Sequence, residues 1–370
     1  MAGAVDAEGS PGVSYVVPVL NEVHYVERAI ASVLEQDYPG PSEVILAAGP
    51  STDGTDQVLA ALIARDPRVR VVANPRAHIA TGLNLAIGAT RHPIIVRVDA
   101  HTALPPGYTR RAVATLQQTG AANVGGIMVA VGRPGVQAAV AWAYNSRLGL
   151  GGGAYHSEEA PAGKAESAYL GVMRAAMLAE VGGFDETVGR GEDWDLNRRL
   201  RAAGHLVWLD PALRVDYWPR ASWQALARQF WATGRWRGEL VRRWHVRNGP
   251  RFFAPPALVV ATAAAALALG LAAVGGLPTE VAAVVAAAPA AYALLLVGVI
   301  VAVPGRWADR LRRSGVLAVM HYAWGAGFLA GLVRGARDAV DSSRAQVSRT
   351  TRGRPSAARP ARPRGRRPGA

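Results

Sequence analysis

The chain has 370 residues, enough for one large or two modest domains with a sizeable core. It contains no cysteine, which excludes disulfides and thiol catalysis. The formal net charge of +14 is uneven, because residues 1–240 hold 22 basic and 23 acidic residues whereas residues 241–370 hold 19 and 4. The neutral front part is therefore a poor candidate for nucleic-acid binding.

The N-terminal part has the pattern of an α/β domain. Residues 1–12 lack a basic stretch followed by an apolar core, so we expect a flexible lead and not a secretory signal. Short Val- and Ile-rich runs then predict buried strands: VSYVVPV (13–19), EVILAAG (43–49), VRVVAN (69–74), PIIVRVD (93–99) and ANVGGIMVAV (122–131). Helical patterns lie between them, the first with Asn21 as its N-cap. This alternation predicts a largely parallel sheet covered on both faces.

Polar residues stand at or just after the ends of three predicted strands, namely Asn21, Asp53 and Asp99. Ligands of such sheets bind beyond the carboxyl ends of the strands, which predicts one shared site. His101 follows Asp99 by two residues, and in an extended segment both side chains point to the same side. A carboxylate with an imidazole suits Mg²⁺ or Mn²⁺. The alternative is a strand that ends on an aspartate near an unrelated histidine.

A second acidic group opens a predicted helix at residues 192–203. Glu192, Asp193 and Asp195 precede several arginines, and favourable interaction with the helix dipole would alone explain this order. However, the acids also follow the Gly-rich approach VGRGED, which suits a carboxylate that accepts a proton from a substrate hydroxyl. Two further strands are predicted after this helix, HLVWLD (205–210) and RVDYW (214–218).

The remaining chain favours a membrane. A Trp- and Arg-rich amphipathic helix from 222 to about 244 and a linker at 241–255 suit a membrane interface. Residues 257–277 and 281–303 are long enough to span a bilayer, although buried core helices are the alternative. The basic loop GRWADRLRRS after them is expected in the cytoplasm. A hairpin of two spans then places the globular N-terminal domain in the cytoplasm too, at the inner (plasma) membrane.

The predicted membrane region covers residues 256–335 and contains a third apolar segment, 316–333. This segment either spans the bilayer or does not. If it spans, the basic tail 336–370 lies outside and breaks the positive-inside rule. If it is re-entrant or interfacial, the tail stays inside, and we favour this reading. The tail has the composition of a disordered segment attracted to an anionic leaflet.

Six motifs in order resemble the family-2 glycosyltransferases of the GT-A fold. They are VVPVLNE (16–22), STDGT (51–55), GLNLAI (82–87), VRVDAH (96–101), VGGFDE (181–186) and GEDWDLNRRL (191–200). With ATGRW (232–236) and HYAWGAGFLAGL (321–332), the chain resembles membrane-attached transferases of exopolysaccharide assembly of the succinoglycan type. The resemblance implies a GT-A-type, Rossmann-like nucleotide-sugar-binding domain at 13–240, followed by a transmembrane hairpin.

The resemblance also implies site residues. The nucleotide-sugar would contact Pro18, Asn21, Glu22, Asp53, Asn84 and Asp99. Asp99 matches the first carboxylate of the metal motif, and Asp193 matches the catalytic base with Glu192 beside it. The implied reaction inverts the anomeric carbon, because Asp193 takes the acceptor proton while the hydroxyl attacks opposite the leaving diphosphate.

The sequence departs from the family pattern in two places. His101 replaces the second carboxylate of the metal motif, and Ala48 stands where a residue contacting the base or ribose is commonly acidic. UDP is therefore expected from family frequency only. Gln229, Arg235 and Trp236 do not match the spacing of the Gln-x-x-Arg-Trp motif of polymer-making synthases. They are candidates for the acceptor side, with an interfacial anchor as the alternative.

Together these features predict an inverting, Mg²⁺- or Mn²⁺-dependent hexosyltransferase of cell-surface polysaccharide synthesis. It would move a sugar from a nucleotide-sugar, first a UDP-sugar, to a lipid-linked saccharide or polysaccharide acceptor at the membrane, beside further polysaccharide-assembly partners. The alternatives are a small processive synthase and a catalytically degenerate membrane scaffold in polysaccharide export. No nucleic-acid partner is expected.

Overall fold

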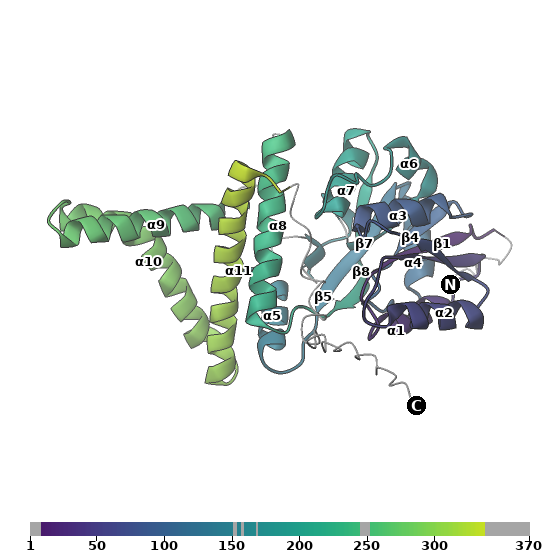
Figure 1. Cartoon of the computed structure of the whole chain (residues 1–370), viewed down its shortest axis with the longest axis horizontal. Coiled ribbons are helices and arrows are strands. Elements are labelled where there is room, and N and C mark those ends of the chain that lie inside the picture. Colours follow the sequence, from purple (N-terminus) through teal and green to yellow (C-terminus); the bar gives the residue numbers. More distant parts are fainter. Residues whose placement is uncertain (1–8, 151–153, 157–158, 168, 245–251, 337–370) are drawn as a thin grey trace, which may run out of the picture.

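The structure is a computed structural model that describes residues 9–150, 154–156, 159–167, 169–244 and 252–336. Residues 1–8 of the expected lead, the middle of the expected linker and nearly all of the tail lie outside the described residues. Figure 1 shows an α/β body on one side and long helices on the other. The predicted α/β class is confirmed.

Within the described residues, eight strands form one sheet. They are β1 (Val13–Val19), β2 (Ser42–Ala48), β3 (Val69–Ala73), β4 (Ile94–Arg97), β5 (Asn123–Ala130), β6 (Gly163–Lys164), β7 (Tyr169–Arg174) and β8 (Val207–Tyr217). Their order is β3-β2-β1-β4-β7-β5-β8-β6. The four strands from β3 to β4 are parallel, so their carboxyl ends meet at one edge of the sheet.

The other half of the sheet departs from the predicted pattern. β7 lies antiparallel between β4 and β5, and the sequence analysis missed it because a short apolar run does not by itself distinguish strand from helix. The two strands expected at 205–210 and 214–218 are one strand, β8. Its pairing with β5 shifts register between Gly125 and Ile127, and such a bulge bends a strand without ending it.

Helices cover both faces of the sheet. One face carries α1 (Val26–Leu34), α2 (Thr55–Arg65) and α4 (Tyr108–Thr119), and the other carries α3 (Ile79–Gly88), α6 (Ala175–Glu180) and α7 (Glu192–Ala202). Alternate residues of β1 supply the two cores, Tyr15 and Val17 on one face and Val16 on the other. Each such buried side chain contributes roughly 1.5–3 kcal/mol, so the loops at the strand ends rest on a rigid base.

The long helices follow the α/β body. They are α8 (Trp223–Trp244), α9 (Ala254–Ala273), α10 (Thr279–Ala302) and α11 (Trp307–Arg334). The last three are long and apolar enough to cross a membrane. In the most apolar stretches of α9 and α10, 17% and 6% of the residues are buried, whereas in α11 the share is 39%. Figure 1 shows α9 projecting away from the body and α10 returning toward α11.

α11 packs lengthwise against α8, and glycines make the contact close (Figure 1). A Cβ added at Gly234 of α8 would lie 2.0 Å from the carbonyl oxygen of Trp324. One added at Gly331 of α11 would lie 1.9 Å from the carbonyl oxygen of Arg235. Only residues without a side chain allow helix backbones to approach this closely. A third core cluster, with Val140 of α5 (Val136–Asn145), Phe230 of α8 and Leu317 of α11, joins this helix pair to the body.

Candidate active site

Asn21 ties the loop after β1 to the loop after β2. Its backbone amide donates to Ser51 Oγ at 3.0 Å, and its side-chain Oδ1 accepts from the Thr52 amide at 2.8 Å. Asn21 has a left-handed φ of 55°, a conformation that asparagine tolerates better than most residues. The N-cap prediction for Asn21 is therefore wrong, because its side chain serves the neighbouring loop and α1 begins only at Val26.

Asp53 holds the same loops from the β2 side. Its Oδ1 accepts from the Thr55 amide at 3.0 Å and from the Thr55 hydroxyl at 2.6 Å, and its Oδ2 accepts from the Val23 amide at 3.2 Å. Burial would raise the pKa of Asp53, but these hydrogen bonds outweigh it, so the pKa lies below its ordinary value. Asp53 thus shapes the loops at the strand ends, and its contact with a nucleoside stays a prediction.

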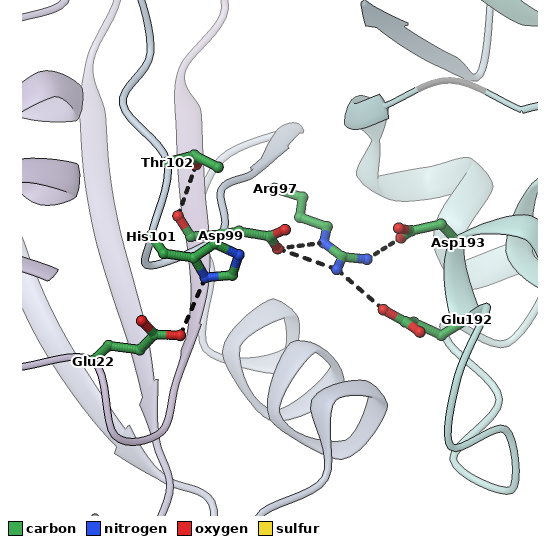
Figure 2. A network of polar contacts seen from close by, with 7 residues as sticks. All are labelled: Glu22, Arg97, Asp99, His101, Thr102, Glu192 and Asp193. Carbon is green, nitrogen blue, oxygen red and sulfur yellow. Dashed lines mark hydrogen bonds and ion pairs between the residues drawn. The ribbon is translucent and has the colours of Figure 1, made fainter. Parts of the chain in front are cut away.

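The backbone turns directly after Asp99. Its carbonyl oxygen accepts from the Thr102 amide at 2.9 Å and from the Thr102 hydroxyl at 2.8 Å, which closes a turn. The extended geometry expected from Asp99 to His101 is therefore wrong, because side chains alternate regularly only while a strand stays extended. Figure 2 shows the Asp99 carboxylate directed at Arg97, whereas His101 Nδ1 lies 3.1 Å from Glu22 Oε1.

Arg97 is the centre of the site, and the sequence analysis did not single it out. Its guanidinium contacts Asp99 at 3.2 Å, Glu192 at 3.1 Å and Asp193 (Figure 2). Only 6% of the Arg97 side chain is exposed, and the three carboxylates keep its pKa well above the usual range against the effect of burial. The available signal was an arginine inside the apolar run IIVRV, where a charged residue requires buried partners.

The charges of this network do not balance. Three carboxylates, on Asp99, Glu192 and Asp193, face one guanidinium, on Arg97, so the fully ionised group has an excess of negative charge. Arg97 is the last residue of β4 and Asp99 follows it by two residues, while the first turn of α7 brings Glu192 and Asp193. The structure thus joins the predicted metal carboxylate and the predicted base, which lie almost 100 residues apart, through Arg97, which was not among the predicted site residues.

Asp193 has the pKa of a group that can exchange protons near neutral pH. Desolvation is the largest cause of the rise in the pKa of Asp193, and the carboxylates of Glu192 and Asp99 add to it. The guanidinium of Arg97 opposes the rise, and the resulting pKa is about 7. The Asp193 side chain keeps 41% of its surface exposed, whereas that of Glu192 keeps 9%. Of the two acids, Asp193 is therefore the one that a substrate hydroxyl can reach.

Asn84 binds the segment that leads to the acidic helix start. Its Nδ2 donates to the Phe184 carbonyl at 2.8 Å and to Glu186 Oε1 at 3.2 Å, and its Oδ1 accepts from the Phe184 amide at 2.9 Å. These contacts fix α3 to the segment that precedes α7. The expected position of Asn84 beside a diphosphate stays a prediction.

The other predicted residues are not gathered at one point. Pro18 is buried in β1, in register with Ala47 of β2. The three acceptor candidates on α8 have separate contacts: Gln229 Nε2 donates to the Tyr217 hydroxyl at 3.4 Å, Arg235 Nε donates to the Gly335 carbonyl at 2.9 Å, and Trp236 is buried against Gly189.

Few side chains of the site are placed to ligate a metal ion. Within the described residues, no three His, Asp or Glu side chains lie close enough together to hold an ion. Asp99 and the His101–Glu22 pair offer two separate sets of donors at the ends of β4 and β1. Hard divalent cations accept one or two carboxylates when phosphate oxygens complete the shell. These residues therefore fit a cation that is held jointly by the protein and a diphosphate.

Comparisons with known proteins identify a matching family model and several similar proteins. A family model described as "Glycosyl transferase family 2" matches residues 14–167. Over 315 residues the chain is 33% identical to the succinoglycan biosynthesis protein ExoA of Rhizobium meliloti (strain 1021), covering 85% of this chain and 92% of that protein. It is also 32% identical, over 96 residues, to the chondroitin synthase of Pasteurella multocida (strain Pm70), covering 26% of this chain and 10% of that protein.

Among solved structures, the mannosyltransferase PcManGT from Pyrobaculum calidifontis, in complex with GDP-Man and Mn²⁺, aligns with a TM-score of 0.55. The alignment covers 89% of both chains at 22% sequence identity. At this identity the likeness concerns the fold alone, and it extends over the α/β body and beyond it.

Proposed function

This chain belongs to glycosyl transferase family 2, and from this premise we propose that it is an inverting, divalent-metal-dependent enzyme of cell-surface polysaccharide synthesis. It transfers a sugar from a nucleotide-sugar to a membrane-associated, lipid-linked acceptor. The observation that carries the proposal is the meeting of Asp99 and Asp193 on one buried guanidinium, that of Arg97. The similarity to a succinoglycan biosynthesis protein supports the exopolysaccharide setting.

The donor is proposed to bind at the edge formed by the carboxyl ends of β1, β2 and β4. Asn21 and Asp53 shape the loops at that edge, and open α/β sheets bind nucleotides there. The fold shared with a mannosyltransferase solved with GDP-Man supports a nucleotide-sugar donor. A UDP-sugar remains our first choice from family frequency, since Ala48 supplies no carboxylate that would read the base or ribose.

Asp193 acts as the base in this proposal. Its exposed carboxylate accepts the proton of the acceptor hydroxyl as that oxygen attacks the anomeric carbon. Arg97 keeps the carboxylate in position and partly ionised, and Glu192 shares the same guanidinium. A Mg²⁺ or Mn²⁺ ion held by Asp99, with His101 nearby, would offset the charge of the leaving diphosphate. A fold likeness to a protein solved with Mn²⁺ supports this choice of ion.

The proposed position of α11 relative to the membrane follows from the helix that packs against it, α8. α8 runs beside α11 and carries Arg235, Arg237 and Glu239 along the stretch where the two helices touch. If α11 spanned the bilayer, α8 would bring these charges to the depth of the hydrocarbon core, where charged side chains are costly. We therefore propose that α9 and α10 span the inner (plasma) membrane, while α8 and α11 lie at its cytoplasmic surface with the catalytic domain.

A panel of nucleotide-sugars tests the proposal. The full chain, purified in detergent, is incubated with UDP- and GDP-sugars, with and without Mn²⁺, and release of the nucleoside diphosphate is measured. One donor should release its nucleoside diphosphate slowly by hydrolysis in water and faster by sugar transfer when a lipid-linked acceptor is present, in both cases only with the metal. Metal-independent hydrolysis would remove the ion from the proposal. No turnover of any donor would favour the degenerate scaffold, and addition of many sugars to one acceptor would favour a processive synthase.

A further inference from the structure

Glu186 ends the motif VGGFDE (181–186), and the proposed reaction gives this glutamate no role. Its side chain keeps 37% of its surface exposed, yet three other side chains donate to it. Thr81 Oγ1 donates to Oε2 at 2.9 Å, Arg76 Nη1 donates to Oε2 at 3.1 Å, and Asn84 Nδ2 donates to Oε1 at 3.2 Å. Fixing a glutamate in one orientation costs rotamer entropy, so these contacts form a specific cluster and not a loose surface pair.

The cluster draws its residues from three segments of the chain. Thr81 and Asn84 belong to α3, and Arg76 lies in the loop between β3 and α3. That loop is bound to the edge where the donor is proposed to bind, because the Asn74 amide donates at 2.7 Å to the carbonyl of Ala48, the last residue of β2. The glutamate itself lies in the segment between α6 and α7. The cluster thus connects the donor edge to the segment that leads to the proposed base.

The contacts of Glu186 involve an ionised acceptor. The hydrogen bond from Asn84 is the largest cause that holds the pKa of Glu186 below its ordinary value, and the hydrogen bond from Thr81 and the charge of Arg76 act in the same direction. Hydrogen bonds to an ionised acceptor are stronger than those between neutral groups. The exposed ion pair with Arg76 contributes little in water, so the two donors on α3 supply most of the attachment.

The same segment is also bound to α7. Arg199 of α7 donates from Nη1 to the Val181 carbonyl at 2.6 Å and from Nη2 to the Gly183 carbonyl at 2.7 Å. Asp195 holds this arginine in place, because its Oδ2 accepts from Arg199 Nε at 2.8 Å and only 1% of the Asp195 side chain is exposed. Residues 181–186 therefore join α3 to α7 by hydrogen bonds on both sides.

The apolar core fixes α7 beyond its first turn. Leu196 and Leu200 are buried in the core that α7 shares with α3, and both follow the turn that carries Asp193. Gly191, directly before this turn, has a left-handed φ of 85°, which glycine adopts without strain. The first turn is thus held from outside the core, by its contact with Arg97 and by the segment that precedes Gly191.

We propose that Glu186 is a positioning residue, which holds the start of α7, and with it Asp193, in a fixed place relative to the edge that binds the donor. The inference rests on the proposed function, because Asp193 is a base only in a transferase. Glu186 contacts no reacting atom, so it acts through residues 181–186 and α7. A displacement of about 1 Å can lower a catalytic rate by roughly a hundredfold, so loss of these contacts should reduce turnover while the donor site stays intact.

Glu186→Ala, in the full chain in detergent, removes the three contacts. The kcat for sugar transfer should fall at least about tenfold, whereas the KM for the donor and the Kd of the nucleoside diphosphate should change less than about twofold. Donor affinity should persist because Asn21 and Asp53 shape the donor loops without Glu186. Glu186→Gln keeps an oxygen acceptor and should recover part of kcat. Glu180→Ala is the matched control, since it removes an exposed acid of α6 that pairs with His205, and it should leave kcat unchanged.

Spin labels test the position of the segment independently of turnover. The chain has no native cysteine, so labels at Leu85→Cys on α3 and Thr187→Cys beside Glu186, both at exposed positions, report one distance. This distance should be narrowly distributed in the protein with Glu186 and broadly distributed in Glu186→Ala, and Glu180→Ala should leave it narrow. An unchanged distribution in Glu186→Ala would overturn the proposal.

The two measurements separate this inference from the proposed function. If the distance broadens in Glu186→Ala and kcat falls at nearly constant KM, both proposals are supported. If the distance broadens, or the melting temperature falls, but the kcat of the folded variant is unchanged, Glu186 only stabilises the fold, and the transferase proposal stands. If the unmodified protein turns over no donor, the proposed function fails, while the labels still decide whether Glu186 holds the segment before α7.

Discussion

The guanidinium of Arg97 contacts the carboxylate of Asp193, so the proposed base is paired with a strand residue that stands two positions before the proposed metal carboxylate, Asp99. Arg97 therefore has three roles at once: it positions the Asp193 carboxylate, it lowers the pKa of that carboxylate, and it positions Asp99. A substitution at one of these residues also alters the charge environment of the others.

Asp193→Asn should lower transfer by at least about a hundredfold, because an amide cannot accept the acceptor proton. Donor binding should persist, since the loops held by Asn21 and Asp53 are unaffected. Sugar transfer and equilibrium binding of the nucleoside diphosphate are measured on the same preparation. Asp185→Asn is the control, because the Asp185 side chain accepts a local hydrogen bond from the Thr187 amide and lies outside the Arg97 network. Retained transfer in Asp193→Asn would remove Asp193 as the base.

The pH dependence of kcat/KM should report a pKa of Asp193 that desolvation and the Glu192 carboxylate raise above its ordinary value, with the contribution of Asp99 offset by the metal ion. A base works only when deprotonated, so activity should reach a plateau above this pKa and fall about tenfold for each pH unit below it. Turnover between about pH 5 and pH 9 at saturating metal tests this sign. An ordinary aspartate would instead keep the enzyme fully active down to about pH 5. A flat profile over the whole range would contradict the assignment.

Arg97→Met should destabilise the protein and move the acidic limb of the profile to higher pH. Removing one partner from a buried ionic group costs roughly 3–5 kcal/mol, because the remaining carboxylates lose their counter-charge. Those carboxylates then raise the pKa of Asp193 further, since Arg97 is the cation that opposes them. Thermal unfolding and the pH profile are measured together.

Two matched variants complete the test of Arg97. Arg97→Lys keeps the charge but loses the planar fork of donors, so both effects should be smaller. Arg65→Met removes an arginine from an exposed pair with Glu27 and should change stability by no more than about 0.5 kcal/mol. If Arg97→Met unfolded at the same temperature as Arg65→Met, the buried network would not be a source of stability.

The first half of the sheet could be predicted because its strands are buried on both faces and bounded by turn residues, as β1 illustrates. β7 could not, since its six residues are too short to show a period and its antiparallel place between β4 and β5 depends on contacts distant in sequence. Likewise, the α11–α8 contact depends on glycines that meet across the two helices, and neither helix shows this contact alone.

The same contrast between local patterns and contacts distant in sequence holds for the candidate active site. Asp99 and Asp193 could be named from motifs, because each motif is local. Their common partner could not, because the pairing of Arg97 with Asp193 exists only after β4 and α7 come together. The expected geometry of His101 failed for a local reason: the turn closed by Thr102 ends the extended backbone at Asp99. Sequence motifs therefore identify the chemically active residues of a site more readily than the contacts between those residues.

His101→Ala should raise the Mn²⁺ concentration that gives half-maximal activity, by a few fold. The effect is expected to be modest because His101 Nδ1 is bonded to Glu22, which leaves Nε2 or a bridging water to meet the ion. Activity is titrated with Mn²⁺ at a fixed donor concentration. His205→Ala is the control, since that ring bonds to Glu180 on α6. An unchanged titration in His101→Ala would show that His101 does not ligate the metal.

The absence of native cysteine makes the membrane arrangement directly testable with single cysteines and a membrane-impermeant maleimide. Trp307 and Val333 lie near the two ends of α11, with exposed fractions of 74% and 78%. If α11 lies at the cytoplasmic surface, Trp307→Cys and Val333→Cys should label from the same side as Ser222→Cys before α8.

Thr279→Cys, at the first residue of α10 directly after the turn from α9, should label from the opposite side, because a two-helix hairpin places its turn across the bilayer. Right-side-out and inverted vesicles provide the two sides. The charges of α8 beside α11 are the physical reason for this outcome, since they cannot enter the hydrocarbon core cheaply. Labelling of Trp307→Cys and Val333→Cys from opposite sides would instead make α11 a third span and require a different environment for α8.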